Sequence, residues 1–158
     1  MKKRIHEVQY DIHESFQELT QNEVELITQA REATKLSYAP YSSFYVGAAV
    51  RFEDGTMLQG SNQENASYPL CNCAEQVVLN YAAMQKAGKT VTSMAVAVDS
   101  ELLGEDPISP CGACRQIILE YEDRQKHDIK IYLVSKTDKV IVFDSIKGLL
   151  PFHFQFFT

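Results

Sequence analysis

Apolar residues recur along the chain at two spacings, one typical of helices and one typical of strands. They return at near-helical intervals after Thr20, and residues 20–23 (TQNE) have capping-box spacing, which predicts a helix that begins at Thr20. A second helix is predicted from Cys73 to Gly88, because glycine commonly ends helices. A third helix is predicted from Cys111. The pattern therefore indicates three main helices.

Five stretches have the composition of strands. The Asp54-Gly55 pair favours a tight turn between the first two, which makes them an antiparallel pair. The third stretch is apolar throughout, as in strands buried on both faces. The order of elements predicts an α/β fold with a mixed five-stranded sheet and helices on both faces. The predicted strands are residues 44–52, 57–62, 94–98, 129–134 and 140–143, and a short helix is predicted at 145–150.

The 158 residues fit one compact domain, which we place at residues 20–158. Residues 1–19 form an N-terminal extension whose scattered apolar positions allow a turn or two of helix, and no role is predicted for it. The start of the chain lacks the apolar core of a signal peptide. No stretch reaches the roughly 18 apolar residues of a membrane span. We therefore expect a cytoplasmic protein without a membrane partner.

The charge balance bears on the class of ligand. Fifteen lysines and arginines against 21 aspartates and glutamates give a formal charge of −6, and no basic run stands out. Nucleic-acid binding depends on clustered cations that neutralise phosphates, so a polynucleotide partner is not expected. A small neutral ligand fits this composition better.

Three of the four cysteines lie near one glutamate, in two segments that each open a predicted helix: residues 73–75 (CAE) and 110–114 (PCGAC). Thiolates bind zinc tightly, and a carboxylate beside the ligands can move protons on a metal-bound water. The unpaired N–H groups of helix N-termini favour thiolate over thiol. The order ligand-x-Glu followed by Pro-Cys-x-x-Cys is a signature of zinc deaminases. We therefore predict an open, catalytic zinc site.

Other interpretations of these residues remain. A closed structural zinc site would use Cys71 as a fourth ligand, but Cys-x-Cys departs from the usual spacing of such sites and leaves Glu75 without a role. A redox pair at Cys111 and Cys114 lacks a thioredoxin-like context. Glu75 taken alone is an ordinary first-turn glutamate that complements the helix dipole. We expect Cys71 to pack as a small apolar group.

Five segments of the chain resemble the small homotetrameric cytidine deaminases. They are residues 38–49 (YAPYSSFYVGAA), 62–68 (NQENASY), 73–75 (CAE), 110–116 (PCGACRQ) and 149–151 (LLP). The resemblance implies a three-layer fold and the zinc-dependent hydrolysis of cytidine and 2′-deoxycytidine to uridine and 2′-deoxyuridine, with release of ammonia, in pyrimidine salvage. It implies one Zn²⁺ per subunit, held by Cys73, Cys111 and Cys114. Glu75 is then the catalytic group that carries the protons.

The resemblance also implies a set of substrate-binding residues. Asn62 and Glu64 are expected on the 3′-hydroxyl of the ribose, and Phe44 against the base. The resemblance further implies a homotetramer in which a neighbouring subunit completes each site. The residues that it implies for this cross-subunit contribution are Ala66, Tyr68 and an aromatic residue of the tail. Alignment on the Leu-Leu-Pro segment gives Phe154 that place, although Phe152 lies close by in the sequence.

One position departs from the family pattern. The family usually has arginine directly after the catalytic glutamate, where it offsets the charge of the thiolates, whereas this chain has Gln76. We expect Gln76 to tune the site through hydrogen bonds without adding charge. Two alternative functions follow: a deaminase for another small substrate, of the blasticidin S type, or a zinc-stabilised scaffold with weakened catalysis.

Overall fold

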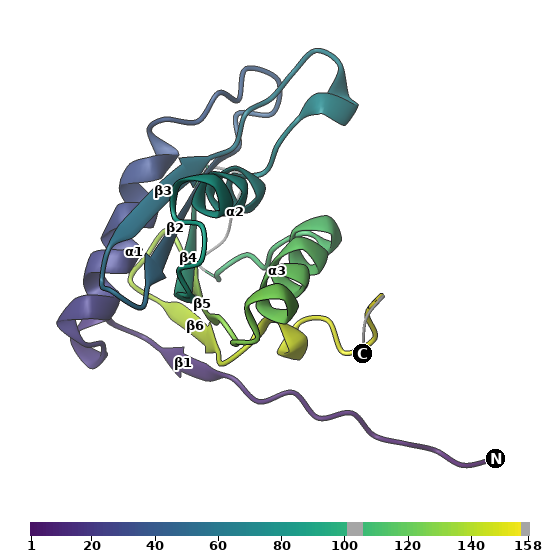
Figure 1. The fold of residues 1–158 in the computed structure, drawn as a ribbon. Coiled ribbons are helices and arrows are strands. Elements are labelled where there is room, and N and C mark those ends of the chain that lie inside the picture. The colour runs from purple at the N-terminus through teal and green to yellow at the C-terminus, as the bar shows by residue number, and fades with distance from the viewer. Residues whose placement is uncertain (101–105, 156–158) are drawn as a thin grey trace.

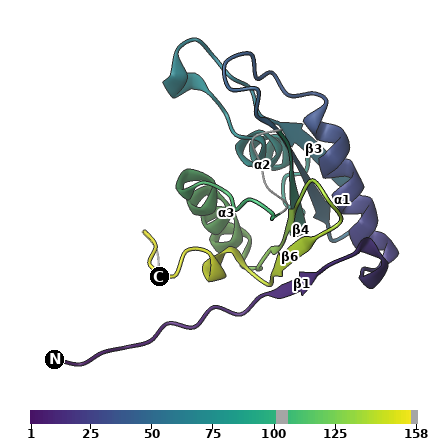
Figure 2. The same cartoon turned by 180° about the vertical axis from the view of Figure 1, so that it is seen from behind.

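The computed structural model describes residues 1–100 and 106–155 and has three layers (Figures 1 and 2). A mixed six-stranded sheet in the order β1-β6-β5-β4-β2-β3 forms the middle layer. Helix α1 covers one face of the sheet, and α2 and α3 cover the other. The α/β prediction with helices on both faces is confirmed. The elements are β1 (Asp11–His13), α1 (Gln21–Thr34), β2 (Tyr45–Phe52), β3 (Met57–Ser61), α2 (Ala74–Gln85), β4 (Val91–Asp99), α3 (Gly112–Gln125), β5 (Lys130–Val134), β6 (Val140–Phe143) and three 3₁₀ turns at Phe16–Glu18, Tyr68–Leu70 and Ile146–Gly148.

The predicted capping box is present at the start of α1. The Thr20 backbone N–H donates to Glu23 Oε2 at 2.8 Å, and the Glu23 N–H donates to Thr20 Oγ1 at 3.4 Å. These two bonds satisfy orphan donors of the first helical turn. The local sequence was therefore sufficient to locate this helix start.

The sheet has six strands, not the predicted five. The additional strand is β1, which comes from the N-terminal extension and pairs antiparallel with β6, from Asp11 opposite Val142 to His13 opposite Val140. The rest of the extension contributes the turn at Phe16–Glu18. Most of β1 is exposed, so its side chains carry no hydrophobic alternation. Backbone pairing with the β6 edge holds the strand, and local sequence patterns do not report such pairing.

Helices α2 and α3, on the face of the sheet opposite α1, each connect two strands that run in the same direction. Strand β2 is antiparallel to both β3 and β4, so β3 and β4 run the same way, and β4 pairs parallel with β5. Helix α2 therefore connects β3 to β4, and α3 connects β4 to β5. Each helix runs antiparallel to the strands that it connects. The N-terminal ends of both helices therefore lie at the same end of the sheet, beyond the carboxyl ends of these strands.

A close approach between backbones places α2 on the sheet. A side chain at Gly60 of β3 would bring a Cβ within 2.9 Å of the Val78 backbone nitrogen in α2, so only glycine fits there. Gly47 has the same function on the other face, where an added Cβ would lie 2.0 Å from the Ala30 carbonyl of α1. The main core between the sheet and α2 and α3 includes Val50, Val78, Leu79, Met94, Ile118 and Leu119.

Among the residues that the structure describes, no helix is both long and apolar enough to cross a membrane.

Candidate active site

Three cysteine sulfurs meet where the N-terminal ends of α2 and α3 lie together. Cys73 is the residue before α2, Cys111 is the residue before α3, and Cys114 is in the first turn of α3. Their sulfur atoms all lie within 4.8 Å of one another, and those of Cys111 and Cys114 are 3.5 Å apart. Sulfurs that share a tetrahedral Zn²⁺ at about 2.3 Å are roughly 3.8 Å from each other. The donor set and its spacing therefore fit one zinc ion.

Cys71 stands apart from this group. Its Sγ accepts a hydrogen bond from the Asn65 backbone N–H at 3.2 Å, and its thiol lies 3.6 Å from the Asn65 carbonyl oxygen. The closed four-cysteine site is therefore not formed by the described residues. Cys71 is half-buried, and its hydrogen bonds join the Asn65 backbone to the segment that leads to α2. It therefore does not pack as the purely apolar group that was expected from the sequence.

The surroundings of the sulfurs favour ionisation of one thiol. A hydrogen bond from the Cys114 thiol lowers the pKa of Cys73 to about 7, against the opposing effects of burial and of the Glu75 charge. The same hydrogen bond and burial raise the pKa of Cys114. A lowered pKa of Cys73 at a helix N-terminus favours the thiolate form, which is the form that binds metal ions.

Glu75 lies in the first turn of α2, beside the sulfurs, and only 4% of its surface is exposed. Burial raises the pKa of this carboxyl, although hydrogen bonds from its own backbone N–H and from the Cys114 thiol act in the opposite direction. It belongs to the cavity wall, whereas the metal-ligand group consists of the three thiols. A carboxyl in this setting can hold or release a proton near the metal position.

The cavity over the sulfurs has a volume of about 430 Å³, enough for a small ligand. Its walls are largely apolar, with a few polar groups at particular points. The lining residues are Ser42, Phe44, Val46, Asn62, Glu64, Cys73, Glu75, Val96, Val98, Ile108, Ser109, Pro110 and Cys111. Phe44, Asn62 and Glu64, predicted from the sequence as substrate-binding residues, are thus on the same cavity as Glu75.

Asn62 and Glu64 are held by the loop and strand opposite them. The Asn62 amide accepts from the Val46 N–H and donates to the Phe44 carbonyl, both at 2.8 Å. The Glu64 carboxylate accepts from the Tyr41 N–H at 2.9 Å and from the Ser42 hydroxyl. These hydrogen bonds, first the one from Ser42, lower the pKa of Glu64, which is therefore ionised at neutral pH.

The remaining predicted residues lie off the cavity. Ala66, Tyr68 and Phe154 are exposed on the surface of the single chain, Tyr68 and Phe154 each with 71% of their surface accessible. Their predicted place in a neighbouring subunit's site stays a prediction. Gln76 is half-buried in the first turn of α2 and is not among the cavity-lining residues.

Sequence reasoning did not single out several of the residues that line the cavity. Val96 and Val98 were recognised only as part of a buried strand, and Ile108 and Ser109 only as part of a connection. Ser42 lies within residues 38–49, one of the segments that carry the family resemblance. The available signal was a hydroxyl two residues before Phe44, the residue expected against the base.

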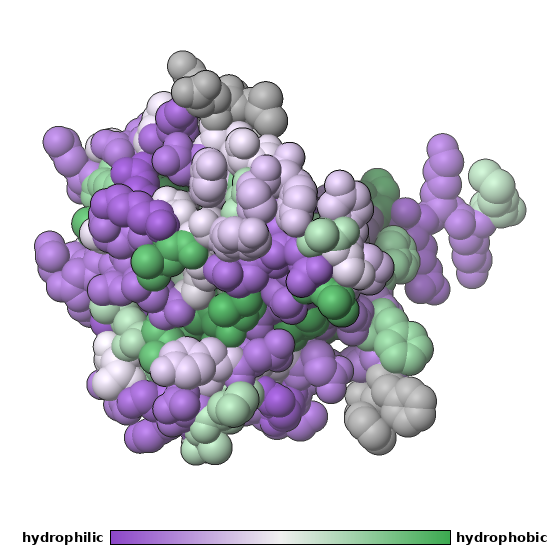
Figure 3. Space-filling model, turned by 90° about the horizontal axis from the view of Figure 1, so that it is seen from above, coloured by the Kyte–Doolittle hydropathy of each residue, from purple (hydrophilic) through white to green (hydrophobic). Residues whose placement is uncertain are grey.

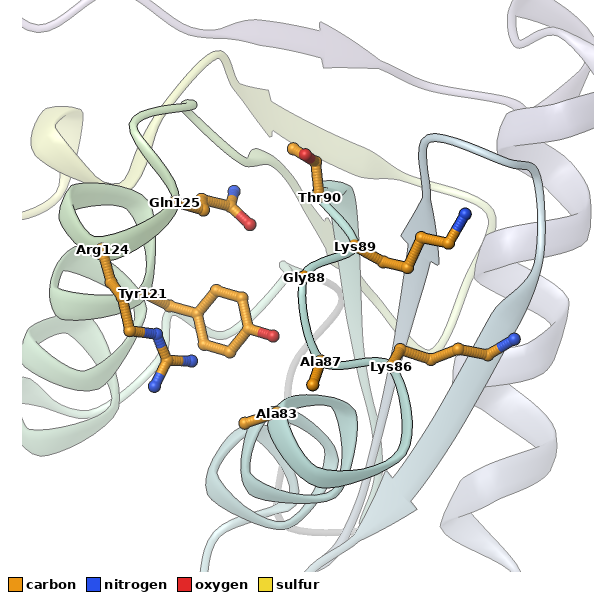
Figure 4. A pocket seen from close by; sticks show the side chains of 9 residues that line it. All are labelled: Ala83, Lys86, Ala87, Gly88, Lys89, Thr90, Tyr121, Arg124 and Gln125. Atoms are coloured by element: carbon orange, nitrogen blue, oxygen red, sulfur yellow. The ribbon is translucent and has the colours of Figure 1, made fainter.

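A second cavity, of about 310 Å³, lies at the opposite ends of α2 and α3 (Figure 4). Tyr121 projects into it with the Arg124 guanidinium 4.4 Å from its ring centre, while Lys86 and Lys89 point away from Tyr121. No cluster of metal-ligating side chains is found here among the described residues. The metal-ligand set is thus confined to the N-terminal ends of the helices.

Comparisons with known proteins agree with this geometry. Residues 20–127 match the model of the cytidine and deoxycytidylate deaminase zinc-binding region. A cytidine deaminase of Halalkalibacterium halodurans is 43% identical over 108 residues, which cover 68% of this chain and 76% of that protein. One of Sporosarcina psychrophila is 43% identical over 96 residues, 61% of this chain and 67% of that protein.

A solved structure is also similar in sequence and in fold. The cytidine deaminase of Burkholderia pseudomallei is 38% identical and superposes with a TM-score of 0.72, covering 86% of this chain and 100% of that one. The family model begins at residue 20, the first residue after the N-terminal extension. With its three thiols and a buried glutamate at the shared zinc-binding region, the chain belongs to the cytidine and deoxycytidylate deaminase family.

Proposed function

We propose that this protein is a zinc-dependent cytidine deaminase that hydrolyses cytidine and 2′-deoxycytidine to uridine and 2′-deoxyuridine, releasing ammonia. The observation that carries the proposal is that the thiols of Cys73, Cys111 and Cys114 meet beside a largely apolar cavity of about 430 Å³ whose wall includes the buried Glu75. The cytidine deaminases to which the chain is similar support the choice of substrate. The role in pyrimidine salvage is part of the same proposal.

Each group of the site has a distinct task in this proposal. Cys73, Cys111 and Cys114 would hold Zn²⁺, and the bound metal would activate a water molecule as the nucleophile near neutral pH. Glu75 takes up the proton that the water loses and delivers it to N3 of the pyrimidine, which makes C4 electrophilic. The water oxygen bonds to C4, and the same carboxyl then moves the remaining proton of that oxygen to the amino group. The C4–N bond breaks, ammonia leaves and C4 keeps a carbonyl oxygen. A carboxyl whose pKa is raised by burial is suited to both steps.

Residues of the cavity wall other than the cysteines and Glu75 bind the base and the sugar of the nucleoside. Phe44 packs against the base, and Asn62 and Glu64 bind the 3′-hydroxyl of the sugar. The Asn62 amide has one donor hydrogen and one acceptor position beyond its bonds to Phe44 and Val46. A site built to satisfy a hydroxyl rejects an analogue without it, because its own polar groups are then left unpaired.

The direct test is to follow uridine formation from cytidine with the zinc-loaded protein. Metal-depleted protein serves as the control, and activity is expected to return when zinc is restored. Absence of turnover with cytidine but activity on blasticidin S would replace the substrate proposal by its alternative. Retention of zinc with no turnover on either would leave the scaffold hypothesis, whose sequence basis is Gln76.

We further propose that the active form is a homotetramer in which Ala66, Tyr68 and Phe154 complete a neighbour's site. Large apolar side chains are exposed on the single chain, including Tyr81 and Met84 of α2, and Figure 3 shows apolar side chains gathered among polar ones on one face. Burial in an oligomer would remove such surface from water. The overall acidic charge favours a nucleoside over a polynucleotide and agrees with a cytoplasmic enzyme.

Subunit complementation tests the shared site. Glu75→Gln and Tyr68→Ala homo-oligomers should each have low activity, and dissociating and reassociating them together should restore part of it, since some sites then combine intact Glu75 and intact Tyr68 from different subunits. Mixtures that stay as inactive as their components would contradict the assignment. Size-exclusion chromatography with light scattering gives the subunit number. Residues 1–19 stay an extension of unassigned role, next to a deaminase domain proposed at residues 20–158.

A further inference from the structure

The loop before β2 carries a serine hydroxyl that the mechanism above does not use. Ser42 lines the cavity, and its hydroxyl donates a hydrogen bond to Glu64 Oε1. Ser42 Oγ also accepts a hydrogen bond from the Phe44 backbone N–H at 3.1 Å. One hydroxyl thus joins the residue proposed to bind the sugar to the residue proposed to pack against the base.

The Glu64 carboxylate is held by three donors from this loop. The backbone N–H groups of Tyr41 and Ser42 donate to Oε2 at 2.9 and 3.3 Å, and the Ser42 hydroxyl donates to Oε1. An ionised carboxylate has about four acceptor positions. Three are occupied by the loop, which leaves one on Oε1 for a hydroxyl in the cavity. The Ser42 hydroxyl is the donor that determines how Oε1 is oriented.

The backbone around Phe44 is fixed on both sides. Its N–H donates to Ser42 Oγ, and its carbonyl accepts from the Asn62 amide at 2.8 Å. Between Ser42 and Phe44, Ser43 has φ of 54°, a left-handed conformation that non-glycine residues rarely adopt. Such a conformation persists where surrounding interactions impose it. Here the Ser43 N–H donates to the Ala39 carbonyl at 3.1 Å, and the hydrogen bonds of Ser42 and Asn62 hold Phe44, the residue that follows.

We propose that Ser42 is a positioning residue that sets the sugar selectivity of the site. Its hydroxyl orients Glu64 so that the free acceptor on Oε1 meets the 3′-hydroxyl of the nucleoside, and it holds Phe44 at the matching distance along the cavity. This rests on the proposed function, in which Glu64 binds that hydroxyl. Ser42 does not touch the reacting C4 atom, so its loss acts on substrate binding and leaves the chemical step nearly intact.

The test compares cytidine with 3′-deoxycytidine, measuring kcat and KM for the zinc-loaded full chain. The wild type should prefer cytidine by roughly 10- to 150-fold in kcat/KM, the value of one hydrogen bond to a charged group. Ser42→Ala should lose most of that preference through a higher KM for cytidine, with 3′-deoxycytidine kinetics nearly unchanged. Ser42→Thr keeps the hydroxyl and should restore the preference. Ser43→Gly, at a neighbouring residue whose φ suits glycine, is the matched control and should behave as wild type.

The outcomes separate this proposal from the one on which it rests. Equal losses of kcat/KM on both substrates in Ser42→Ala would show that the residue only supports the fold, and an unchanged preference would show that it positions nothing; either overturns the proposal. A preference that survives Glu64→Gln, or that the wild type lacks, would overturn the sugar contact itself. Zinc content and thermal unfolding of each variant establish that the compared proteins are folded.

Discussion

The two ends of the helix pair α2 and α3 differ in chemistry although the same helices build both. At the N-terminal ends, Cys73, Cys111 and Glu75 line a largely apolar cavity, and the Cys114 sulfur lies within 4.8 Å of the other two sulfurs. At the C-terminal ends, a cavity of similar size is bordered by a tyrosine and three cationic residues (Figure 4). Unpaired N–H groups stabilise thiolates at one end, and unpaired carbonyls favour cations at the other. Helix direction therefore separates the reactive end from the inert one.

Two buried glutamates, Glu75 and Glu122, differ in a similar way in the groups that surround them. Among the described residues, Glu75 and Glu122 are the buried acidic side chains, with 4% and 2% of their surface exposed. Glu122 accepts from the Ile129 N–H at 2.8 Å, the Ile146 N–H at 3.1 Å and the Ser145 hydroxyl at 2.8 Å. Burial raises the pKa of both carboxyls. What distinguishes them is that Glu122 is committed to the fold while Glu75 faces the cavity.

The largest expected effect comes from converting Glu75 to glutamine, with the same change at Glu122 as the comparison. Glu75→Gln removes the group proposed to carry protons and should lower kcat by roughly 10²–10⁴-fold, while zinc content stays at the wild-type level. Glu122→Gln keeps the shape of its side chain and should leave kcat near wild type. The measurement is steady-state deamination of cytidine together with metal analysis. Comparable losses in the two variants would remove the distinction between a catalytic and a structural carboxyl.

Truncating the structural glutamate should instead affect stability. Glu122→Ala leaves the buried N–H groups of Ile129 and Ile146 without their acceptor, which should lower the free energy of unfolding by at least about 1–3 kcal/mol. Urea unfolding of the zinc-loaded protein measures this change. Glu122→Gln retains a carbonyl acceptor and is the matched control.

Glu122 should also make stability depend on pH. Its folded-state pKa is raised above the ordinary 4.5, mainly by burial, so its contribution is fully present below pH 4.5 and is lost as pH rises through the folded-state pKa. As the pH rises above 4.5 and through the folded-state pKa, the unfolding free energy of the wild type should therefore decline relative to that of Glu122→Gln, which does not titrate. Parallel curves would show that the fold does not perturb this carboxyl.

A smaller effect is expected from Gln76→Arg. If the N-terminal ends of α2 and α3 already offset much of the thiolate charge, a further cation should change turnover by no more than about tenfold, or roughly 1.4 kcal/mol. Side-by-side kinetics of the two proteins measure it. A collapse of turnover would show that the site is built around the amide, and a large gain would show that helix ends compensate too little.

The smallest effect is expected at the opposite end of the helices. Arg124→Ala removes the cation over the Tyr121 ring, which should lower stability by about 0.5–1 kcal/mol at this exposed position. Deamination kinetics should be unchanged, because the C-terminal ends take no part in the chemistry. Impaired kcat/KM in this variant would connect the two ends and weaken the comparison.

Much of the fold was predictable because local signals were strong. The capping box at Thr20 located α1, and the Asp54-Gly55 turn located the β2–β3 hairpin. Strand β1 was missed because its three largely exposed residues are held by pairing with β6, a long-range interaction without a local pattern. The burial of Glu122 was missed for a similar reason, since this residue lies on a helix like any surface glutamate and only its hydrogen bonds to Ile129, Ser145 and Ile146 account for its burial.

The sequence by itself determined the donor types, the order of the elements and the family resemblance, because residue identity and short-range spacing carry that information. Only the tertiary structure decided that Cys73 and the Cys111–Cys114 pair meet, since this depends on two crossovers whose helices begin at the same edge of the sheet. It also decided that Cys71 stays outside the cluster and that Ser42 faces Glu64. Contacts between residues far apart in the chain follow from packing, which no local pattern encodes.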